Sequence, residues 1–191
     1  NALRSIHDDC VELDIDAQRS IEEWVRLLSD IGPLDQLLWI APECSEVLDS
    51  QAMLQAQSQG LFCLMRVFKA LLQLDYRNHA LKWTVVTIQS QSVHAADPVF
   101  PAHAAIHGLV GSLAKEYPTW RIRLADLEQG TTWPVDELLR LPFDPQGNAL
   151  VYRSGQWLRQ ALISVQTLSE TSTVYRRHGV YVIIGGAGGL G

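Results

Sequence analysis

Short apolar runs alternate along this chain with longer stretches in which apolar residues recur at helical spacing. The short runs predict buried strands, and the three clearest are Gln36–Ala41, Leu81–Ile88 and Trp120–Leu127. The helical spacing predicts three long helices, over Ala17–Ser29, Ser50–Leu74 and Ala102–Tyr117. Because parallel strands need long crossover connections, which helices supply, this order predicts an α/β fold with a doubly wound, mostly parallel sheet.

Weaker signals predict the remaining elements. Val11–Asp16 alternates apolar and polar residues, which predicts a half-buried strand, and Asp16 or Ser20 is expected to cap the helix that follows. A short helix and two paired strands are predicted over Trp133–Leu141, Asn148–Arg153 and Gln156–Val165. Residues 166–178, rich in serine and threonine, are interpreted as a linker. We therefore expect one α/β unit over 1–165 and the start of a second over 179–191.

Charge and hydropathy argue against two classes of partner. The 191 residues carry a formal net charge of −6 with a pI near 5.4, which argues against nucleic acid. The longest apolar stretch, Gly60–Leu74, contains Arg66 and Lys69, whose burial in lipid would be too costly for a membrane span. The N-terminal residues lack the apolar core of a signal peptide. Scattered cysteines, odd in number, fit reduced thiols in a cytoplasmic protein: Cys10, Cys44 and Cys63.

Residues 180–191 read VYVIIGGAGGLG, an apolar run that predicts a strand followed by a glycine-rich turn. In such a turn backbone N–H groups approach a pyrophosphate closely, and side chains would block that approach. The residues expected to contact a dinucleotide are Gly185, Gly186, Ala187, Gly188, Gly189, Leu190 and Gly191. A glycine-rich tail without a ligand is the alternative. The helix and the ribose-binding side chain that complete such a site are not in this chain, so we expect it to bind a dinucleotide weakly by itself.

The segment His107–Glu116 resembles the helix that carries the catalytic tyrosine and lysine of short-chain dehydrogenases/reductases. Matching its Gly-Leu pair to that family places Val99 at the tyrosine position and His103 at the lysine position. In the family the tyrosine protonates the carbonyl, and the lysine lowers the pKa of the tyrosine. Valine has no proton to give, and Ser90 and Ser92, near the family's serine position, would have no tyrosine as a partner. The resemblance implies that this interior unit is catalytically inactive.

An inactive reductase-like unit followed by a glycine turn resembles the ketoreductase region of modular polyketide synthases, and the related animal fatty-acid synthase. The catalytic half of that region opens with Thr-Gly-Gly-x-Gly-Gly-Leu-Gly. This chain has Ile184 in place of the threonine, and it keeps all the glycines of the motif. The resemblance implies a degenerate, Rossmann-like short-chain reductase fold over 1–165, acting as a structural half without catalytic residues. A catalytic half would begin at residue 179.

The same resemblance implies a cofactor and partners. NADPH is the cofactor of the complete ketoreductase, held in part by Gly185–Gly191. The implied partners are the catalytic subdomain, other synthase domains, and an acyl carrier protein whose phosphopantetheine arm carries a β-ketoacyl chain.

Other functions fit part of the pattern. A stand-alone Rossmann-like binding module predicts a clean monomer, whereas a scaffold half predicts a large exposed apolar patch. An independent reductase is disfavoured because no tyrosine of the chain is followed four residues later by lysine. A metal site at His103 and His107, four residues apart on one helix, is disfavoured because a third ligand is missing. We expect partly exposed or core histidines there instead.

Overall fold

The computed structural model of this protein describes residues 10–43, 49–164 and 175–182. The chain divides into two compact units, Asn1–Gln160 and Ala161–Gly191. Within the second unit, residues 161–164 and 175–182 form neither helix nor strand. The strand predicted to start at Val180 is therefore not seen over residues 180–182, and its remainder lies outside the described residues. All described helices and strands belong to the first unit.

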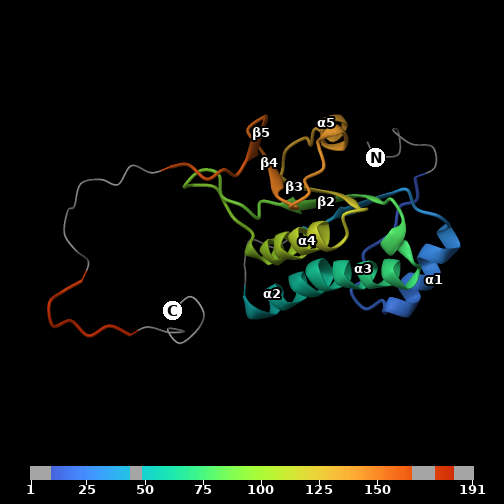
Figure 1. Ribbon diagram of the computed structural model, residues 1–191, viewed down its shortest axis with the longest axis horizontal. Helices are drawn as coiled ribbons and strands as arrows, with labels where there is room; N and C mark the ends of the chain where they lie inside the picture. The colour runs from blue at the N-terminus through green and yellow to red at the C-terminus, as the bar shows by residue number, and fades with distance from the viewer. Residues whose placement is uncertain (1–9, 44–48, 165–174, 183–191) are drawn as a thin grey trace. The chain divides into compact units, whose positions relative to one another are not determined.

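A five-stranded sheet forms the centre of the first unit, in the order β1-β2-β3-β4-β5 (Figure 1). The strands are β1 (Gln36–Ile40), β2 (Lys82–Ile88), β3 (Arg121–Leu127), β4 (Ala149–Arg153) and β5 (Gln156–Arg159). The first four run parallel, and β5 returns antiparallel to β4. The α/β class and the mostly parallel sheet predicted from the sequence are confirmed. The prediction succeeded because continuous apolar runs are typical of strands buried on both faces.

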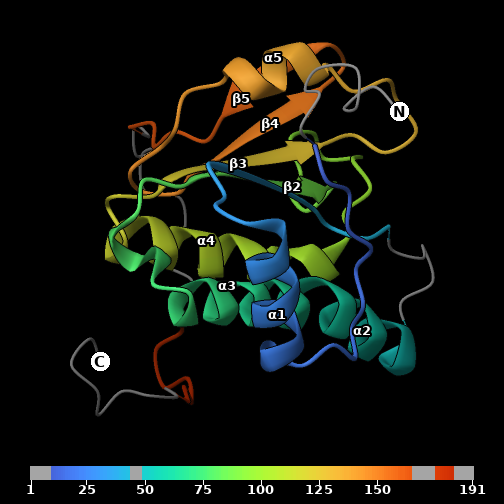
Figure 2. The same cartoon turned by 90° about the vertical axis from the view of Figure 1, so that its right-hand side faces the viewer.

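The helices of the described residues flank both faces of the sheet: α1, α2, α3 and α4 lie on one side and α5 on the other (Figure 2). They are α1 (Ile21–Ile31), α2 (Ser50–Gln57), α3 (Cys63–Gln73), α4 (Ala104–Glu116) and α5 (Val135–Arg140), with 3₁₀ turns η2 (Tyr76–Asn78) and η3 (Pro101–His103). The main core lies between the sheet and the four-helix layer, where Leu64, Trp83 and Ile106 are completely buried. On the other face Leu138 of α5 packs in a smaller core with Val86.

The long helix predicted over Ser50–Leu74 contains a widened turn. A π-helical turn, η1 (Ser58–Phe62), separates α2 from α3, and the backbone stays right-handed through both joints. Gly60 in this turn is buried, and a Cβ there would lie 3.7 Å from the Cδ1 atom of Ile106 in α4. A single wide turn shifts the apolar spacing only slightly, so the spacing predicted the helix and missed the π turn.

Two strand predictions needed correction. The strand predicted at Val11–Asp16 is wrong, because these residues form neither strand nor helix. Leu13 and Ile15 are half-buried against the main core while the residues beside them are more exposed, so the alternation marks an irregular segment lying on that core. The strand predicted over Gln156–Val165 ends at Arg159, and residues 160–164 are exposed.

The first helix begins at Ile21, later than the predicted start at Ala17, and Ser20 is its N-cap. The Ser20 hydroxyl accepts a hydrogen bond from the Glu23 backbone N–H at 3.2 Å, and the Glu23 carboxylate accepts one from the Ser20 N–H at 2.7 Å. This reciprocal pair is a capping box, which satisfies two backbone donors that the helix cannot. Of the two caps expected from the sequence, Ser20 is the one the structure confirms.

A close contact between two glycines joins α4 to the turn before β4. Gly147 has a φ of 67°, and a Cβ at this position would lie 2.7 Å from the Cα of Gly111 and 2.9 Å from the carbonyl oxygen of Val110. Real Cβ atoms do not approach backbone atoms so closely, so any side chain here would push the turn away from the helix. The two backbones therefore depend on glycine for their spacing.

We expect Gly147→Ala to lower the free energy of unfolding by about 3 kcal/mol, because the new methyl group adds a clash to the left-handed strain. Gly130→Ala is the matched control, since Gly130 has a φ of 73° and no atom within 4 Å of a built Cβ. Strain alone should cost that variant about 1 kcal/mol. Urea denaturation of the two variants measures the difference, and equal losses would contradict the close approach.

Candidate functional site

Ligands of α/β proteins bind at the carboxyl ends of parallel strands, and in this sheet polar side chains gather there. Thr87 of β2 and Asp126 of β3 are register partners, and their side chains meet on the face of the sheet that α4 covers. The chain turns after β2 at Gln89, whose φ is 43°, and the following Ser90 reaches back to Asp126. We name the resulting group the Asp126 cluster, comprising Thr87, Ser90, Gln91, His107, Asp126 and Arg153.

The Asp126 carboxylate is completely buried and accepts hydrogen bonds on both oxygens. Its Oδ1 accepts from the Thr87 hydroxyl at 2.6 Å, the Ser90 hydroxyl at 2.5 Å and the Ser90 N–H at 2.9 Å. Its Oδ2 accepts from the Arg153 guanidinium at 2.5 Å and the Gln91 N–H at 3.3 Å. Burial alone would raise the pKa of Asp126, but the hydrogen bonds from Ser90, Thr87 and Arg153 together outweigh it and lower that pKa. The carboxylate is therefore ionised at neutral pH.

Arg153 provides the opposite charge and is 3% exposed. Besides its ion pair with Asp126, its guanidinium donates to the backbone carbonyls of Asp126 at 3.1 Å, Tyr152 at 2.8 Å and Gln91 at 2.9 Å. One side chain thus joins β3, β4 and the loop after β2. Charge-assisted bonds to several carbonyls help offset the cost of removing a guanidinium from water.

The Ser90 hydroxyl lies between Asp126 and His107, 2.7 Å from the Nε2 atom of the imidazole. On the other side of the ring, the amide Nε2 of Gln91 lies 3.1 Å from the His107 Nδ1 atom. With the Gln91 amide nitrogen in this orientation Nδ1 accepts, and the neutral ring then carries its hydrogen on Nε2. His107 therefore donates to Ser90, and Ser90 donates to Asp126. A nucleophilic serine needs a free imidazole lone pair at this place, so the geometry is that of a structural network.

From the sequence, Ser90 was expected to lack a tyrosine partner. In the structure its hydroxyl does have hydrogen-bond partners. Its partners are Asp126, His107 and Thr87, none of which has the role of the family's tyrosine. Burial lowers the pKa of His107, which keeps the imidazole neutral beside the carboxylate. Sequence reasoning missed Asp126 and Arg153 altogether, although a carboxylate inside an apolar strand is a signal of a buried polar network.

The other two positions matched to the reductase family hold a partly exposed valine and a buried histidine. Val99 is an apolar side chain, 39% exposed. His103 is completely buried: its Nδ1 lies 3.2 Å from the Ile88 N–H nitrogen and its Nε2 lies 2.9 Å from the Pro42 carbonyl. Burial lowers the pKa of His103, so this position holds a neutral ring that ties the ends of β1 and β2 together. Ser92 is exposed, and its hydroxyl donates within its own loop.

The residues expected to contact a dinucleotide, Gly185–Gly191, all lie outside the described residues. Among the residues that the structure does describe, no three His, Cys, Asp or Glu side chains are grouped so as to hold a metal ion. His103 and His107 are a core histidine and a partly exposed histidine of the Asp126 cluster, as the sequence suggested. Over the same described ranges, no helix has the length and hydropathy needed to cross a membrane.

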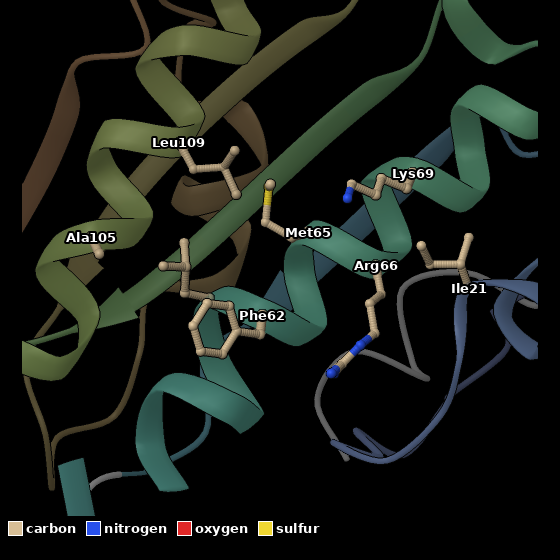
Figure 3. A pocket seen from close by; sticks show the side chains of 8 residues that line it. Ile21, Phe62, Met65, Arg66, Lys69, Ala105 and Leu109 are labelled. Carbon is tan, nitrogen blue, oxygen red and sulfur yellow. The ribbon is translucent and has the colours of Figure 1, made fainter. Parts of the chain in front are cut away.

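A second feature is an apolar hollow on the helix layer, which we name the α3–α4 groove. Its volume is about 500 Å³, and it lies among α1, η1, α3 and α4 (Figure 3). Phe62, Met65 and Leu109 supply apolar walls, and Arg66 and Lys69 supply two cations. The Arg66 guanidinium donates a hydrogen bond to the Ala17 carbonyl, and the lining residues include no carboxylate, histidine, cysteine or hydroxyl group, so the groove is a candidate binding surface.

We expect Asp126→Ala to lower the free energy of unfolding by about 3–5 kcal/mol, because it leaves the Arg153 guanidinium buried without a counter-charge. The double variant Asp126→Leu with Arg153→Met replaces both charges by apolar groups and should recover most of that loss. Urea denaturation measures both, and Asp136→Asn, at an exposed residue of α5, is the control. An Asp126→Ala protein as stable as the wild type would refute the buried ion pair.

Acid should weaken the fold through His103 and His107, whose pKa values burial lowers. Histidines of the unfolded chain take up protons below about pH 6.5, whereas these two buried histidines of the folded chain resist protonation. The free energy of unfolding therefore decreases as the pH is lowered. His107→Gln keeps a polar side chain and removes one such group. Its urea midpoint should change less than that of the wild type between about pH 7.5 and about pH 5.5. Identical changes in the two proteins would show that His107 does not titrate as its burial requires.

Comparisons with known proteins relate this chain to segments of polyketide synthases. No protein-family model matches the chain. It is 45% identical over 179 residues to polyketide synthase PksM of Bacillus subtilis strain 168, covering 94% of this chain and 4% of that protein. It is 41% identical over 184 residues to PksN of the same strain, covering 94% of this chain and 3% of PksN. Polyketide synthase ThaG of Burkholderia thailandensis is 38% identical over 165 residues, covering 86% of this chain and 3% of ThaG. The chain thus spans only a few per cent of the relatives it matches.

Solved structures share the fold at low identity. A multidomain structure of a keto acid-selecting NRPS module, with adenylation, ketoreductase and pseudo-Asub domains, has a TM-score of 0.61 at 17% identity, covering 73% of this chain and 12% of that one. An alcohol dehydrogenase from Thermococcus sibiricus has a TM-score of 0.55 at 19% identity, covering 75% of this chain and 74% of that one. A short-chain dehydrogenase/reductase from Vibrio parahaemolyticus has a TM-score of 0.52 at 15% identity, covering 63% of each chain. The chain is therefore homologous to a segment of bacterial polyketide synthases, and its first unit has the Rossmann-like fold of short-chain dehydrogenases.

Proposed function

We propose that this chain is the structural, non-catalytic half of a ketoreductase region in a polyketide synthase. In the complete region, a second half would reduce the β-keto group of an acyl thioester carried by an acyl carrier protein. The similarity to segments of polyketide synthases supports the setting, and the short-chain dehydrogenase fold supports the reductase class.

The Asp126 cluster is the observation that carries this proposal. Reduction of a ketone adds a hydride at carbon and a proton at oxygen, and the proton must come from a positioned acid. At the positions matched to the reductase family, this unit has Val99, which has no proton, and His103, which is buried and neutral. The Ser90 hydrogen is held by Asp126. The unit has kept the reductase fold and uses its former active-site edge for internal hydrogen bonds.

The carboxyl edge of the described sheet does not fit a dinucleotide. The Arg153 guanidinium is paired with the buried Asp126 carboxylate, and the hydroxyl groups of Thr87 and Ser90 also donate to that carboxylate, so these donors are not directed at a pyrophosphate. In the complete ketoreductase, NADPH would supply the hydride. We place its phosphates at the glycine turn Gly185–Gly191, where backbone N–H groups would bind them.

A scaffold half also needs an apolar surface for its neighbour, since obligate interfaces commonly bury more than about 2,000 Å². The helix layer exposes large apolar side chains of this kind, including Leu54, which is 70% exposed, and Phe62, which is 50% exposed. These side chains favour the scaffold half over a stand-alone module that needs no partner.

The direct experiment compares two proteins in the same assay. One is this 191-residue chain, and the other is the parent synthase's ketoreductase region, with this chain and the sequence that follows it. Oxidation of NADPH is followed with a β-ketoacyl thioester as substrate. We expect turnover by the longer protein only. Turnover by the 191-residue chain would contradict the scaffold role, and a longer protein that folds but reduces no β-keto thioester would contradict the reductase setting.

A variant inside the Asp126 cluster sharpens this test. We expect Ser90→Ala in the longer protein to leave kcat and KM unchanged, because the Ser90 hydroxyl belongs to a structural network. Thermal unfolding of the same variant should show the loss of about 1–3 kcal/mol that follows removal of a buried hydrogen-bonding hydroxyl. A fall in kcat of about a hundredfold with the fold intact, as expected for loss of a catalytic hydrogen bond, would place Ser90 in the reaction.

A further inference from the structure

The sheet face over which α5 lies (Figure 2) carries three cations at the amino ends of β2 and β3. Side chains alternate between the two faces along a strand, so Lys82, Thr84, Arg121 and Arg123 share the face of the smaller core. In the register of the two strands, Lys82 lies opposite Arg121, and Thr84 lies opposite Arg123. Neighbouring strands are about 5 Å apart and alternate residues of one strand about 7 Å apart, so these three positive charges are crowded. We name these four residues the β2–β3 basic face.

Arg123 is the buried member of this face, only 4% exposed. Its Nη1 atom donates to the Thr84 hydroxyl at 3.3 Å, so the guanidinium leans from β3 toward β2. The ring centroid of Phe143 lies 4.4 Å from the guanidinium carbon. The Nε atom is buried and has no hydrogen-bond partner among the described residues. A guanidinium has five N–H donors, so most of the hydrogen-bonding capacity of Arg123 is unused.

The basic face has no counter-charge within the part of the chain that the structure describes. No carboxylate there lies within ion-pair distance of Lys82, Arg121 or Arg123. Burial lowers the pKa of the Arg123 guanidinium. The contrast is Arg153, which is equally buried but is paired with the Asp126 carboxylate. One buried arginine of this sheet is thus neutralised, and the other is not.

This arrangement is costly as it stands. A buried guanidinium without a partner loses far more hydration free energy than an aromatic ring restores. Like charges directly opposite each other on neighbouring strands, as Lys82 and Arg121 are, destabilise a sheet further. The excess of positive charge is local, because the whole chain has a formal net charge of −6. A negative group bound to this face would offset both costs.

We propose that the β2–β3 basic face binds a carboxylate-bearing segment of the parent synthase that lies outside this chain. An aspartate or glutamate of that segment would accept hydrogen bonds from the unused donors of Arg123, between the ammonium of Lys82 and the guanidinium of Arg121. The chain spans only a few per cent of the synthases to which it is similar, so other segments of the polypeptide are available. The inference does not depend on the proposed reductase setting.

Charge and permanence together favour a protein segment over a free anion. The cost of the unpaired guanidinium is present whenever this unit is folded, so the compensating charge must also be present throughout. A segment of the same polypeptide meets that condition, because tethering gives it a high effective concentration. A second copy of this chain would bring the same cations together across a two-fold interface, which like charges oppose.

Crosslinking of the intact parent synthase with a carbodiimide tests the contact directly, because this reagent joins an amine to a carboxylate that touches it. Mass spectrometry should find Lys82 joined to an aspartate or glutamate outside the 191 residues. Arg123→Met should lower the yield of that product about tenfold, because the carboxylate loses its buried donor. Products of Lys115, an exposed lysine of α4, are the control and should keep their yield. No product at Lys82, or a product only with carboxylates of this chain, would overturn the proposal.

Hydrogen exchange over β2 and β3 gives a second test, in which one substitution should act in opposite directions. In the 191-residue chain, Arg123→Met removes an unpaired buried charge and should slow exchange about tenfold. In the intact synthase it leaves the bound carboxylate without its partner and should speed exchange about tenfold. Arg26→Met, at an exposed arginine of α1, is the control and should change neither protein. Changes of the same sign in both proteins, or no change in either, would overturn the proposal.

Inorganic phosphate distinguishes a free anion from a protein segment. Added at millimolar concentration to the 191-residue chain, it should slow exchange no more than chloride does at equal ionic strength. Saturable slowing that Arg123→Met abolishes would assign the β2–β3 basic face to a free phosphate-type anion and overturn the protein occupant. Reductase activity is not a readout in these experiments, so failure of the proposed function would leave their results unaffected.

Discussion

The buried ion pair between Asp126 and Arg153 is the interaction on which the carboxyl end of this sheet depends. Removing either charge from water costs several kcal/mol, so neither would be stable there alone. The cost is offset because each charge also receives or makes several hydrogen bonds, to Thr87, Ser90 and Gln91 and to nearby carbonyls. Three strands, a loop and one helix are thereby fixed at the edge where an α/β fold ordinarily binds its ligand.

Under the proposed scaffold role, that arrangement would explain how a reductase fold persists without reductase chemistry. The unit keeps the parallel sheet and the helix layer, which give it a core centred on residues such as Leu64, Trp83 and Ile106. At the polar edge of the sheet the side chains of the Asp126 cluster form hydrogen bonds with one another. Under the same proposal the outward surface would be the functional part of the unit. The α3–α4 groove, with Arg66 and Lys69, lies on the helix layer (Figure 3).

Local patterns in the sequence were sufficient for most of the fold. Continuous apolar runs predicted β1, β2 and β3, because a strand covered on both faces needs no polar alternation. Alternation misled at Val11–Asp16, where half-burial of Leu13 and Ile15 arises without strand pairing. The candidate site was harder to predict, since Asp126 meets Ser90 and Arg153 across separations of 36 and 27 residues that no local spacing rule encodes. The one available signal was a carboxylate inside an apolar strand.

The most direct test of the central claim, that the polar edge of the first unit is closed to cofactor, is an NMR titration of this chain with NADPH. The probes are the backbone amides of Ser90 and Asp126 and the imidazole nitrogens of His107, all within the Asp126 cluster. We expect these signals to stay in place at millimolar NADPH, with His107 showing a neutral ring protonated at Nε2. Saturable shifts centred on these three residues would contradict the account, because they would show a dinucleotide bound at the cluster whose donors and acceptors the structure pairs with one another.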